Sequence, residues 1–189
     1  MKSISAFIFV LAAGVPCAQA ASAVPGVGNF EKVNDHVYRG AQPTGQGFQS
    51  LAKLGIQTVI DLRESGDARS VSEWKAVEAA GMQYISIPMK GYQTPSDQSI
   101  AGVLTVLENT TTGPVFVHCR RGADRTGAVI ACYRIEHDHW TNERALAEAR
   151  SMGMSWLQLS IQHYVQTYKP RADIGAAVLA ILAPMPVAQ

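Results

Sequence analysis

One segment constrains the fold of this chain more than any other, the stretch from Val117 to Gly127, which reads VHCRRGADRTG. A short apolar run, Val115–Val117, precedes its polar part and is typical of a buried strand. An apolar pattern over residues 125–138 follows it and is typical of a central, buried helix. The segment therefore predicts a strand, a tight loop and a helix in direct succession, with Cys119 and Arg125 at the two ends of the loop.

The residue types in this loop favour binding of a phosphate group. A short turn between a strand and a helix can direct successive backbone N–H groups inward, and the helix N-terminus adds unpaired donors and partial positive charge. Gly122 permits the tight backbone path, and Arg125 can bind two phosphate oxygens with its planar guanidinium. The expected phosphate-binding residues run through the loop in order: Arg120, Arg121, Gly122, Ala123, Asp124 and Arg125.

Cys119 lies at the base of this loop, where it can act as a nucleophile. Electropositive sites lower the pKa of a thiol from about 8.5 to roughly 3.5–7.5. The thiolate could then attack phosphorus and form a phosphocysteine. Thr126 could hydrogen-bond the sulfur and ease its departure, while His118 is expected to orient the loop through its ring nitrogens.

The segment resembles the signature HC-x5-R-[ST] of the cysteine-dependent protein tyrosine phosphatase superfamily. The stretch Tyr38–Pro43 and the short chain resemble its compact, dual-specificity-like branch. The resemblance covers residues 35 to 168 and implies one α/β domain with a central, mainly parallel sheet and helices on both faces. It also implies hydrolysis of phosphate monoesters, on phosphorylated proteins or small molecules, without a metal or other cofactor.

The rest of the chain alternates between strand and helix patterns, which agrees with a parallel sheet flanked by helices. Strands are expected at 37–39, 58–62 and 84–87. Helices are expected around 48–54, 74–80 and 100–107, in a segment that Thr141 caps, and around 161–168.

Two aspartates are candidates for the residue that donates a proton to the leaving group. Asp97 stands in the loop before the 100–107 helix, where this superfamily places its acid, but Thr94, Pro95 and Asp97 equally fit a helix start as cap, first residue and acidic partner. Asp124 is the alternative, since myotubularin-like lipid phosphatases have an acid assigned at that position. Asp124 could instead pair with Arg120 or Arg121.

Several basic and acidic residues have two interpretations at this stage. Arg120 and Arg121 could favour a substrate with several phosphates or acidic neighbours, or form a solvated pair that offsets Asp124. Asp61 and Arg63 end a strand at the edge where such sheets bind ligands, and could orient the loop or pair with each other.

Residues 1–20 have the pattern of a secretory signal peptide. Lys2 begins it, Ile4–Val15 is too short to span a bilayer, and Ala18-Gln19-Ala20 suits cleavage after Ala20. We expect an exported protein, periplasmic or secreted. Residues 21–34 are expected to form a flexible lead-in, 35–169 the phosphatase domain and 170–189 a tail whose apolar part, 174–182, cannot cross a membrane.

Charge and cysteine content narrow the expected partners. A formal net charge of +1 gives no field that would attract nucleic acid, and we expect a monomer without stable membrane insertion after cleavage. Cys132 lies about two helical turns beyond Arg125, too far from Cys119 for a disulfide, so it is expected to be a buried apolar residue.

The sequence leaves three functions open. The first is a phosphatase of the phosphotyrosine or dual-specificity type. The second is a phosphoinositide or inositol-phosphate phosphatase, and the third is a phosphate-binding module without turnover.

Overall fold

The computed structural model describes residues 23–64 and 68–170. The predicted signal peptide and the apolar part of the tail lie outside these residues. The strands are β1 (Glu31–Lys32), β2 (Val37–Ala41), β3 (Thr58–Asp61), β4 (Gln83–Ser86) and β5 (Val115–Cys119). The helices are α1 (Gly45–Lys53), α2 (Ala68–Ala79), α3 (Asp97–Glu108), α4 (Asp124–Glu136), α5 (Asn142–Ser151) and α6 (Leu159–Thr167), with a short 3₁₀ turn at Thr110–Thr112.

The five strands form one sheet in the order β1-β2-β5-β3-β4. Only the β1–β2 pair is antiparallel, so the sheet is mainly parallel, as the resemblance implied. The central strand β5 is buried along its whole length, which explains why its first three residues are apolar. Its carboxyl end carries Cys119 to the edge of the sheet.

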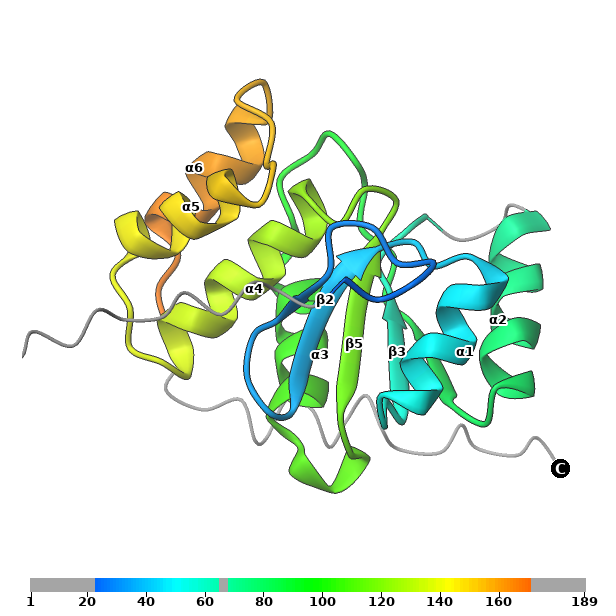
Figure 1. The fold of residues 1–189 in the computed structure, drawn as a ribbon. Helices are drawn as coiled ribbons and strands as arrows, with labels where there is room; N and C mark the ends of the chain where they lie inside the picture. The colour runs from blue at the N-terminus through cyan, green and yellow to red at the C-terminus, as the bar shows by residue number, and fades with distance from the viewer. Residues whose placement is uncertain (1–22, 65–67, 171–189) are drawn as a thin grey trace, which may run out of the picture.

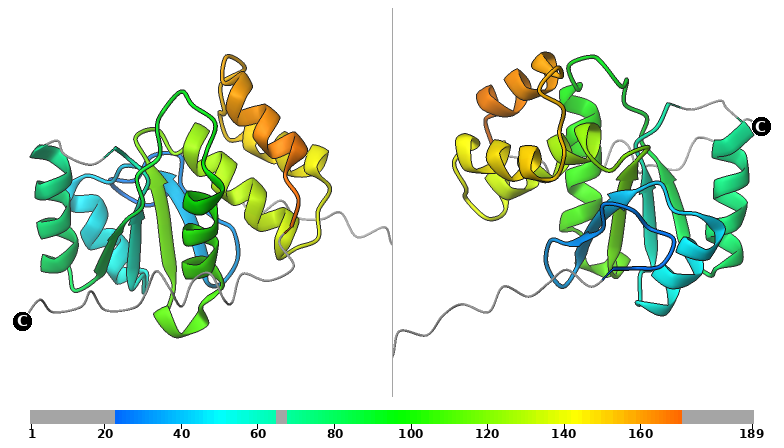
Figure 2. Two further views of the ribbon diagram at one scale, coloured as in Figure 1. Left: turned by 180° about the vertical axis from the view of Figure 1, so that it is seen from behind. Right: turned by 45° about the horizontal axis from the view of Figure 1, so that its top comes forward.

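The helices cover both faces of the sheet (Figures 1 and 2). On one face, α3 and α4 pack on Val115 and Val117, and α5 and α6 pack outside α4. On the other face, α1 and α2 pack on Phe116 and Val59. The alternation of side chains along a strand therefore places Val117 and Cys119 on the α4 side and Phe116 and His118 on the α2 side.

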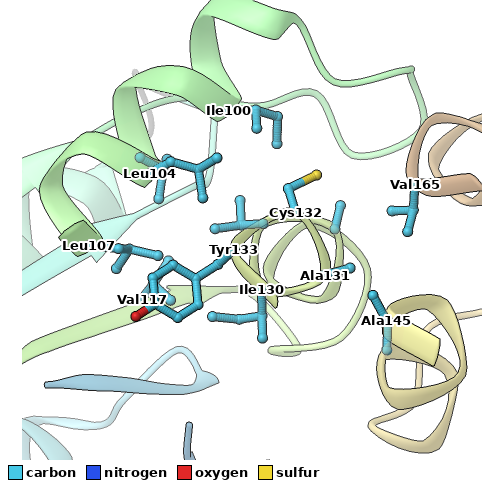
Figure 3. Packing of buried hydrophobic residues seen from close by; sticks show 14 of the residues in the cluster. Ile100, Leu104, Leu107, Val117, Ile130, Ala131, Cys132, Tyr133, Ala145 and Val165 are labelled. Atoms are coloured by element: carbon cyan, nitrogen blue, oxygen red, sulfur yellow. The ribbon is translucent and has the colours of Figure 1, made fainter. Parts of the chain in front are cut away.

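Helix α4 is the central helix that the sequence predicted. Figure 3 shows side chains of α3, β5 and α4 converging, with Ile100, Leu104 and Val117 among them. Cys132 is fully buried in this cluster, and Cys119 and Cys132 do not form a disulfide with each other, as expected from their spacing. Ten of the residues of α4 are buried, so its position is fixed by packing on several sides.

Two helix starts test the predicted caps. Thr141 is the N-cap of α5 and accepts a hydrogen bond from the Arg144 amide, as predicted. The predicted cap of α3 at Thr94 is wrong. Ser96 is the N-cap, since its hydroxyl accepts from the Ser99 amide at 3.1 Å, and Asp97 is the first helical residue.

The segment predicted as a flexible lead-in differs in the structure. Its described part contains β1, and Val27 and Val33 are buried. These contacts explain the difference, because apolar side chains spaced too irregularly for a strand pattern can still be buried by tertiary packing. The compact unit therefore begins before residue 35.

Among the residues that the structure describes, no helix is both long and apolar enough to cross a membrane.

Candidate active site

Residues from the N-terminal part of the chain form hydrogen bonds to the outer side of the loop between β5 and α4. The Gln42 amide donates to the carbonyl of Arg120 at 3.3 Å. Asn29 donates from its side-chain amide to the carbonyl of Gly122 at 2.9 Å, and the fully buried Arg39 donates to the same oxygen at 2.7 Å. Three bonds thus fix carbonyls of the loop on its outer side.

This anchoring fixes where the amides of the loop point. In a planar trans peptide the N–H lies opposite the preceding carbonyl. With the carbonyls of Arg120 and Gly122 directed outward, the amides of Arg121 and Ala123 face inward. The Arg121 amide is one of the groups that hydrogen-bond the sulfur of Cys119. At least two of the loop amides, those of Arg121 and Ala123, therefore face the inner side of the loop.

Gly122 is required at its position by two observations. Its φ is +68°, a conformation that other residues rarely adopt. A Cβ there would lie 2.3 Å from the carbonyl carbon of Gly40. The loop can therefore approach β2 this closely only with glycine.

Cys119 is 2% exposed and lies at the base of a cleft of about 550 Å³. Burial raises the pKa of the thiol. Hydrogen bonds from the Thr126 hydroxyl and amide, the positive charge of Arg125 and the Arg121 amide lower it, and the net effect is a pKa below the ordinary value. The Thr126 hydroxyl is buried and makes no other hydrogen bond within the described residues, so the sulfur of Cys119 is its hydrogen-bond partner.

Arg125 is held in place at the edge of this cleft. Its Nη1 donates to the carbonyl of Met89 at 3.2 Å and to that of Leu62 at 3.4 Å. The guanidinium also lines the cleft together with Cys119. Its position at the N-terminus of α4 leaves N–H donors along the edge of the guanidinium available to an oxyanion bound in the loop.

His118 lies against the backbone of the loop and does not line the cleft. The ring is fully buried, its Nδ1 lies 3.2 Å from the carbonyl of Cys119, and its Nε2 lies 2.8 Å from Glu73. Burial lowers the pKa of His118, but the hydrogen bond and negative charge of Glu73 and the charge of Asp61 raise it above the ordinary value overall.

Asp61 and Arg63 pair with each other and extend this buried network. The Arg63 side chain donates to both carboxylate oxygens of Asp61, at 2.9 and 2.7 Å, and to Glu73 at 2.7 Å. The ligand atoms of Asp61, Glu73 and His118 lie within 4.8 Å of one another, a spacing that could hold a metal ion. Arg63 already compensates both carboxylates, so this cluster is a buried ion network that supports β5.

The structure separates the two aspartates that the sequence proposed as acids. Asp97 is not among the residues that line the cleft; its carboxylate accepts a hydrogen bond from Tyr164 at 2.7 Å, beside a second, smaller cavity. Asp124 lines the cleft, and its carboxylate accepts from the Ser155 amide at 2.8 Å and pairs with Arg121. The predicted pairing of Asp124 with a loop arginine is confirmed.

Several residues of the cleft were not predicted from the sequence. The cleft is also lined by Glu64, Gly91, Tyr92, Ser155, Leu157 and Gln158. Glu64 follows β3, and the others come from the loops after β4 and α5. These residues carry no local motif, although the rule that ligands bind at the carboxyl ends of parallel strands points to the position of Glu64.

Comparisons with known proteins agree with this geometry. A curated relative, "Probable tyrosine-protein phosphatase DG1060" of Dictyostelium discoideum, is 26% identical over 144 residues, which are 74% of this chain and 85% of the relative. "Inositol diphosphatase DSP3" of Arabidopsis thaliana is 27% identical over 135 residues, 69% of this chain and 65% of the relative.

A solved structure has the same fold. The crystal structure of Pseudomonas aeruginosa TpbA is 26% identical, with a TM-score of 0.65, and the match covers 85% of this chain and 94% of that one. A complex of TpbA with pTyr matches at 25% identity and a TM-score of 0.63, over 82% and 91% of the two chains.

The family model described as "DSP-PTPase phosphatase fused to NAD+ Kinase" matches residues 23–167, which include the anchoring residues Asn29 and Arg39 and the whole cleft. This match covers most of the chain, and the chain therefore belongs to the DSP-PTPase family of cysteine-dependent phosphatases.

Proposed function

We propose that the protein hydrolyses phosphate monoesters, with phosphotyrosine as the leading substrate class, through a phosphocysteine intermediate. The observation that carries the proposal is a buried thiol of lowered pKa at the base of an inward amide ring, beside Arg125. The thiolate attacks phosphorus, the ester oxygen leaves with a proton, and water then hydrolyses the S–P bond to release phosphate. The amides and Arg125 bind the three non-bridging oxygens in both steps.

The proton for the leaving group is assigned here to Glu64. Asp97 is remote from the cleft, and both oxygens of Asp124 are engaged, one with the Ser155 amide and one with Arg121. Glu64 lines the cleft, is exposed, and has one 3.3 Å bond from the Gly91 amide. It comes from the loop after β3, so it can reach the leaving oxygen from a strand adjacent to the nucleophile.

The depth of the cleft supports phosphotyrosine over phosphoserine. Cys119 is 2% exposed, so phosphorus must reach well below the protein surface. A tyrosine ring holds its phosphate further from a peptide backbone than a serine methylene does. Two similar proteins point the same way, since one is named a tyrosine-protein phosphatase and TpbA was crystallised with pTyr.

A second candidate substrate class is an inositol phosphate. Arg120 is exposed in the cleft and Arg121 has a side chain that is 60% exposed, so both present positive charge beside the phosphate loop. A relative is named an inositol diphosphatase. The third option, a binding module without turnover, has less support because the thiol, the arginine and the amide ring are all in place.

Turnover of p-nitrophenyl phosphate tests the reaction. We expect the wild type to release p-nitrophenol and Cys119→Ser to release none while still binding vanadate. A wild-type protein that binds vanadate without turnover would establish the silent module instead. Phosphotyrosine peptides and soluble inositol phosphates, compared by kcat/KM, then rank the substrate classes.

The assignment of Glu64 is tested by leaving-group dependence. Glu64→Gln is expected to slow phenyl phosphate much more than p-nitrophenyl phosphate, because a poor leaving group depends on protonation. Asp97→Asn is the matched control and should leave both rates unchanged. Equal losses on the two substrates in Glu64→Gln would contradict a donor role.

We also propose that the protein is exported and acts as a monomer. The residue pattern of positions 1–20 supports export. Cell fractionation of a C-terminally tagged chain, with Ala18 and Ala20 replaced by bulky residues as the control, tests it. Size-exclusion chromatography with light scattering tests the monomer.

A further inference from the structure

The mouth of the cleft carries a group of exposed apolar side chains. Tyr92 and Leu157 line the cleft and are 87% and 68% exposed. Trp156 and Leu159, beside Leu157 in the sequence, are 77% and 71% exposed. We call these four residues the apolar rim. Soluble proteins rarely leave several large apolar side chains together in water unless the surface binds something.

The backbone that carries the rim is firmly attached to the active site. The Ser155 amide donates to Asp124 at 2.8 Å, and the Gln158 side chain donates to the carbonyl of Gly91 at 3.0 Å. Gln162 donates to the carbonyl of Ser155 at 2.9 Å. These bonds join the α5–α6 loop to the phosphate loop and to the loop after β4, which lie side by side in Figure 1. The exposure of the rim is therefore a feature of a fixed surface.

Positive charge accompanies the rim. Lys90 is exposed two residues before Tyr92, and Arg120 is exposed in the cleft beside the rim. The acidic residues of the same surface are Glu64 and Asp124, and Asp124 is paired with Arg121. The surface thus combines projecting aromatic and aliphatic groups with cations, a combination that binds anionic lipid headgroups and the apolar layer beneath them.

We propose that the apolar rim docks the cleft onto an anionic lipid surface, where the enzyme acts on phosphate monoesters held at that surface. The second half of this statement rests on the proposed function. Trp156 and Tyr92 suit the headgroup level, where amphipathic rings accumulate, and the two leucines suit the adjoining acyl region.

Vesicle binding tests the docking step. The rim variant is Trp156→Ala with Leu159→Ala, two positions that do not line the cleft. The matched control is Trp74→Ala with Leu54→Ala, an exposed tryptophan and leucine of similar chemistry at 43% and 46% exposure on the α1–α2 side. All proteins carry the same ends, so differences in co-sedimentation with phosphatidylglycerol–phosphatidylcholine vesicles report on the substituted residues alone.

The expected result is at least about a tenfold weaker partition of the rim variant, since two apolar side chains no longer insert. The control should bind like the wild type. Lys90→Gln should weaken binding about fivefold on anionic vesicles and little on pure phosphatidylcholine. Turnover of p-nitrophenyl phosphate should be equal in the rim variant, the control and the wild type, while phosphate release from vesicles containing phosphatidic acid falls in the rim variant only.

Two results would overturn the proposal. One is equal vesicle binding by the wild type and the rim variant, or none by either. The other combines two observations: the wild type does not bind vesicles, and the rim variant has a lower kcat/KM than the wild type on a phosphotyrosine peptide in vesicle-free buffer. That combination would assign the rim to binding of a protein substrate. Failure of the wild type to hydrolyse p-nitrophenyl phosphate would refute the proposed function, and the binding comparison would still decide the docking.

Discussion

Cys119 shows how local hydrogen bonds can outweigh burial. A thiol that is 2% exposed would ordinarily resist ionisation, and burial is the largest single influence on its pKa. The hydrogen bonds from Thr126 and Arg121 and the charge of Arg125 together outweigh burial, so the pKa of the thiol is lower than its ordinary value. The net effect is that the thiolate form of a buried cysteine is favoured.

The first prediction concerns the titration of this thiol. The rate of alkylation of Cys119 by iodoacetamide should rise with pH at a midpoint below the ordinary value of about 8.5. Thr126→Ala removes the leading hydrogen bond to sulfur and should move the midpoint upward. Cys119→Ser supplies the background from the other cysteines, and a midpoint at the ordinary value in the wild type would contradict the described site.

The second prediction concerns Arg39, which acts through the loop. Burial lowers the pKa of this guanidinium, and Glu31, its partner across the β1–β2 pair, opposes that effect. Arg39→Met keeps most of the apolar volume but removes the shorter of the two hydrogen bonds to the carbonyl of Gly122. We expect kcat to fall by about 100-fold, as for a roughly 1 Å displacement of catalytic groups.

The control for Arg39 is Arg39→Lys, which retains one donor and should restore part of kcat. Vanadate affinity should fall in parallel with kcat in Arg39→Met, because both depend on the inward amides. A variant with lower stability and unchanged vanadate affinity would show that Arg39 serves folding alone.

At the level of elements, β5 and α2 are joined by the ion pair of His118 and Glu73. The pKa of His118 is raised overall, so the pair stabilises the folded protein fully below about pH 6.5, the ordinary histidine value. This contribution is lost as pH rises through the higher folded-state pKa. Asp61 and Arg63 contact the same network and stay charged across that range.

The third prediction follows from this sign. In a Cys119→Ser background, where the active-site thiol does not titrate, the free energy of unfolding should fall between about pH 6.5 and the raised pKa of His118. Adding Glu73→Gln should flatten the profile in that range. Urea denaturation across pH measures both, and a profile with the same slope in the two proteins would show that the pair contributes nothing.

The fourth prediction concerns the approach of the phosphate loop to β2. Gly122→Ala places a Cβ against Gly40 and forces a residue other than glycine to a φ of +68°. The strain should cost about 1–3 kcal/mol of stability and displace the amide of Ala123. Gly45→Ala is a suitable control, since a Cβ there meets nothing within 4 Å. Calorimetry and vanadate affinity together measure the effect.

At the scale of the whole molecule, the N-terminal segment completes the active site. Asn29 holds the carbonyl of Gly122, and Val27 and Val33 are buried in two different core clusters. The sheet edge, both cores and the phosphate loop are therefore tied together by residues that precede β2.

The fifth prediction compares two N-terminal boundaries. A chain that begins at residue 35, the domain boundary expected from the sequence, should be less stable than one that begins at residue 23. Each lost valine removes about 1.5–3 kcal/mol of burial energy. Activity should fall further than stability explains, because Asn29 is also lost, and Asn29→Ala in the longer chain measures that share. Equal activity of the two chains would contradict the role of the segment.

The sequence by itself determined the chemistry and most of the architecture. Cys119, Gly122, Arg125 and Thr126 lie within one short segment, so the succession of strand, loop and helix N-terminus already places them close together. Apolar periodicity likewise located α3, β5 and α4, since burial of one face imposes a regular spacing.

Only the tertiary structure decided which distant residues complete the site. Three separate segments contribute to the site: Asn29 hydrogen-bonds the phosphate loop, and Glu64 and Leu157 line the cleft. Asp97, a candidate acid from the sequence, begins α3 and accepts a hydrogen bond from Tyr164 instead. Their places depend on how α3, α5 and α6 pack around α4 and how β1 extends the sheet. Such contacts form between elements that are far apart in the chain, so the local spacing of residues does not predict them.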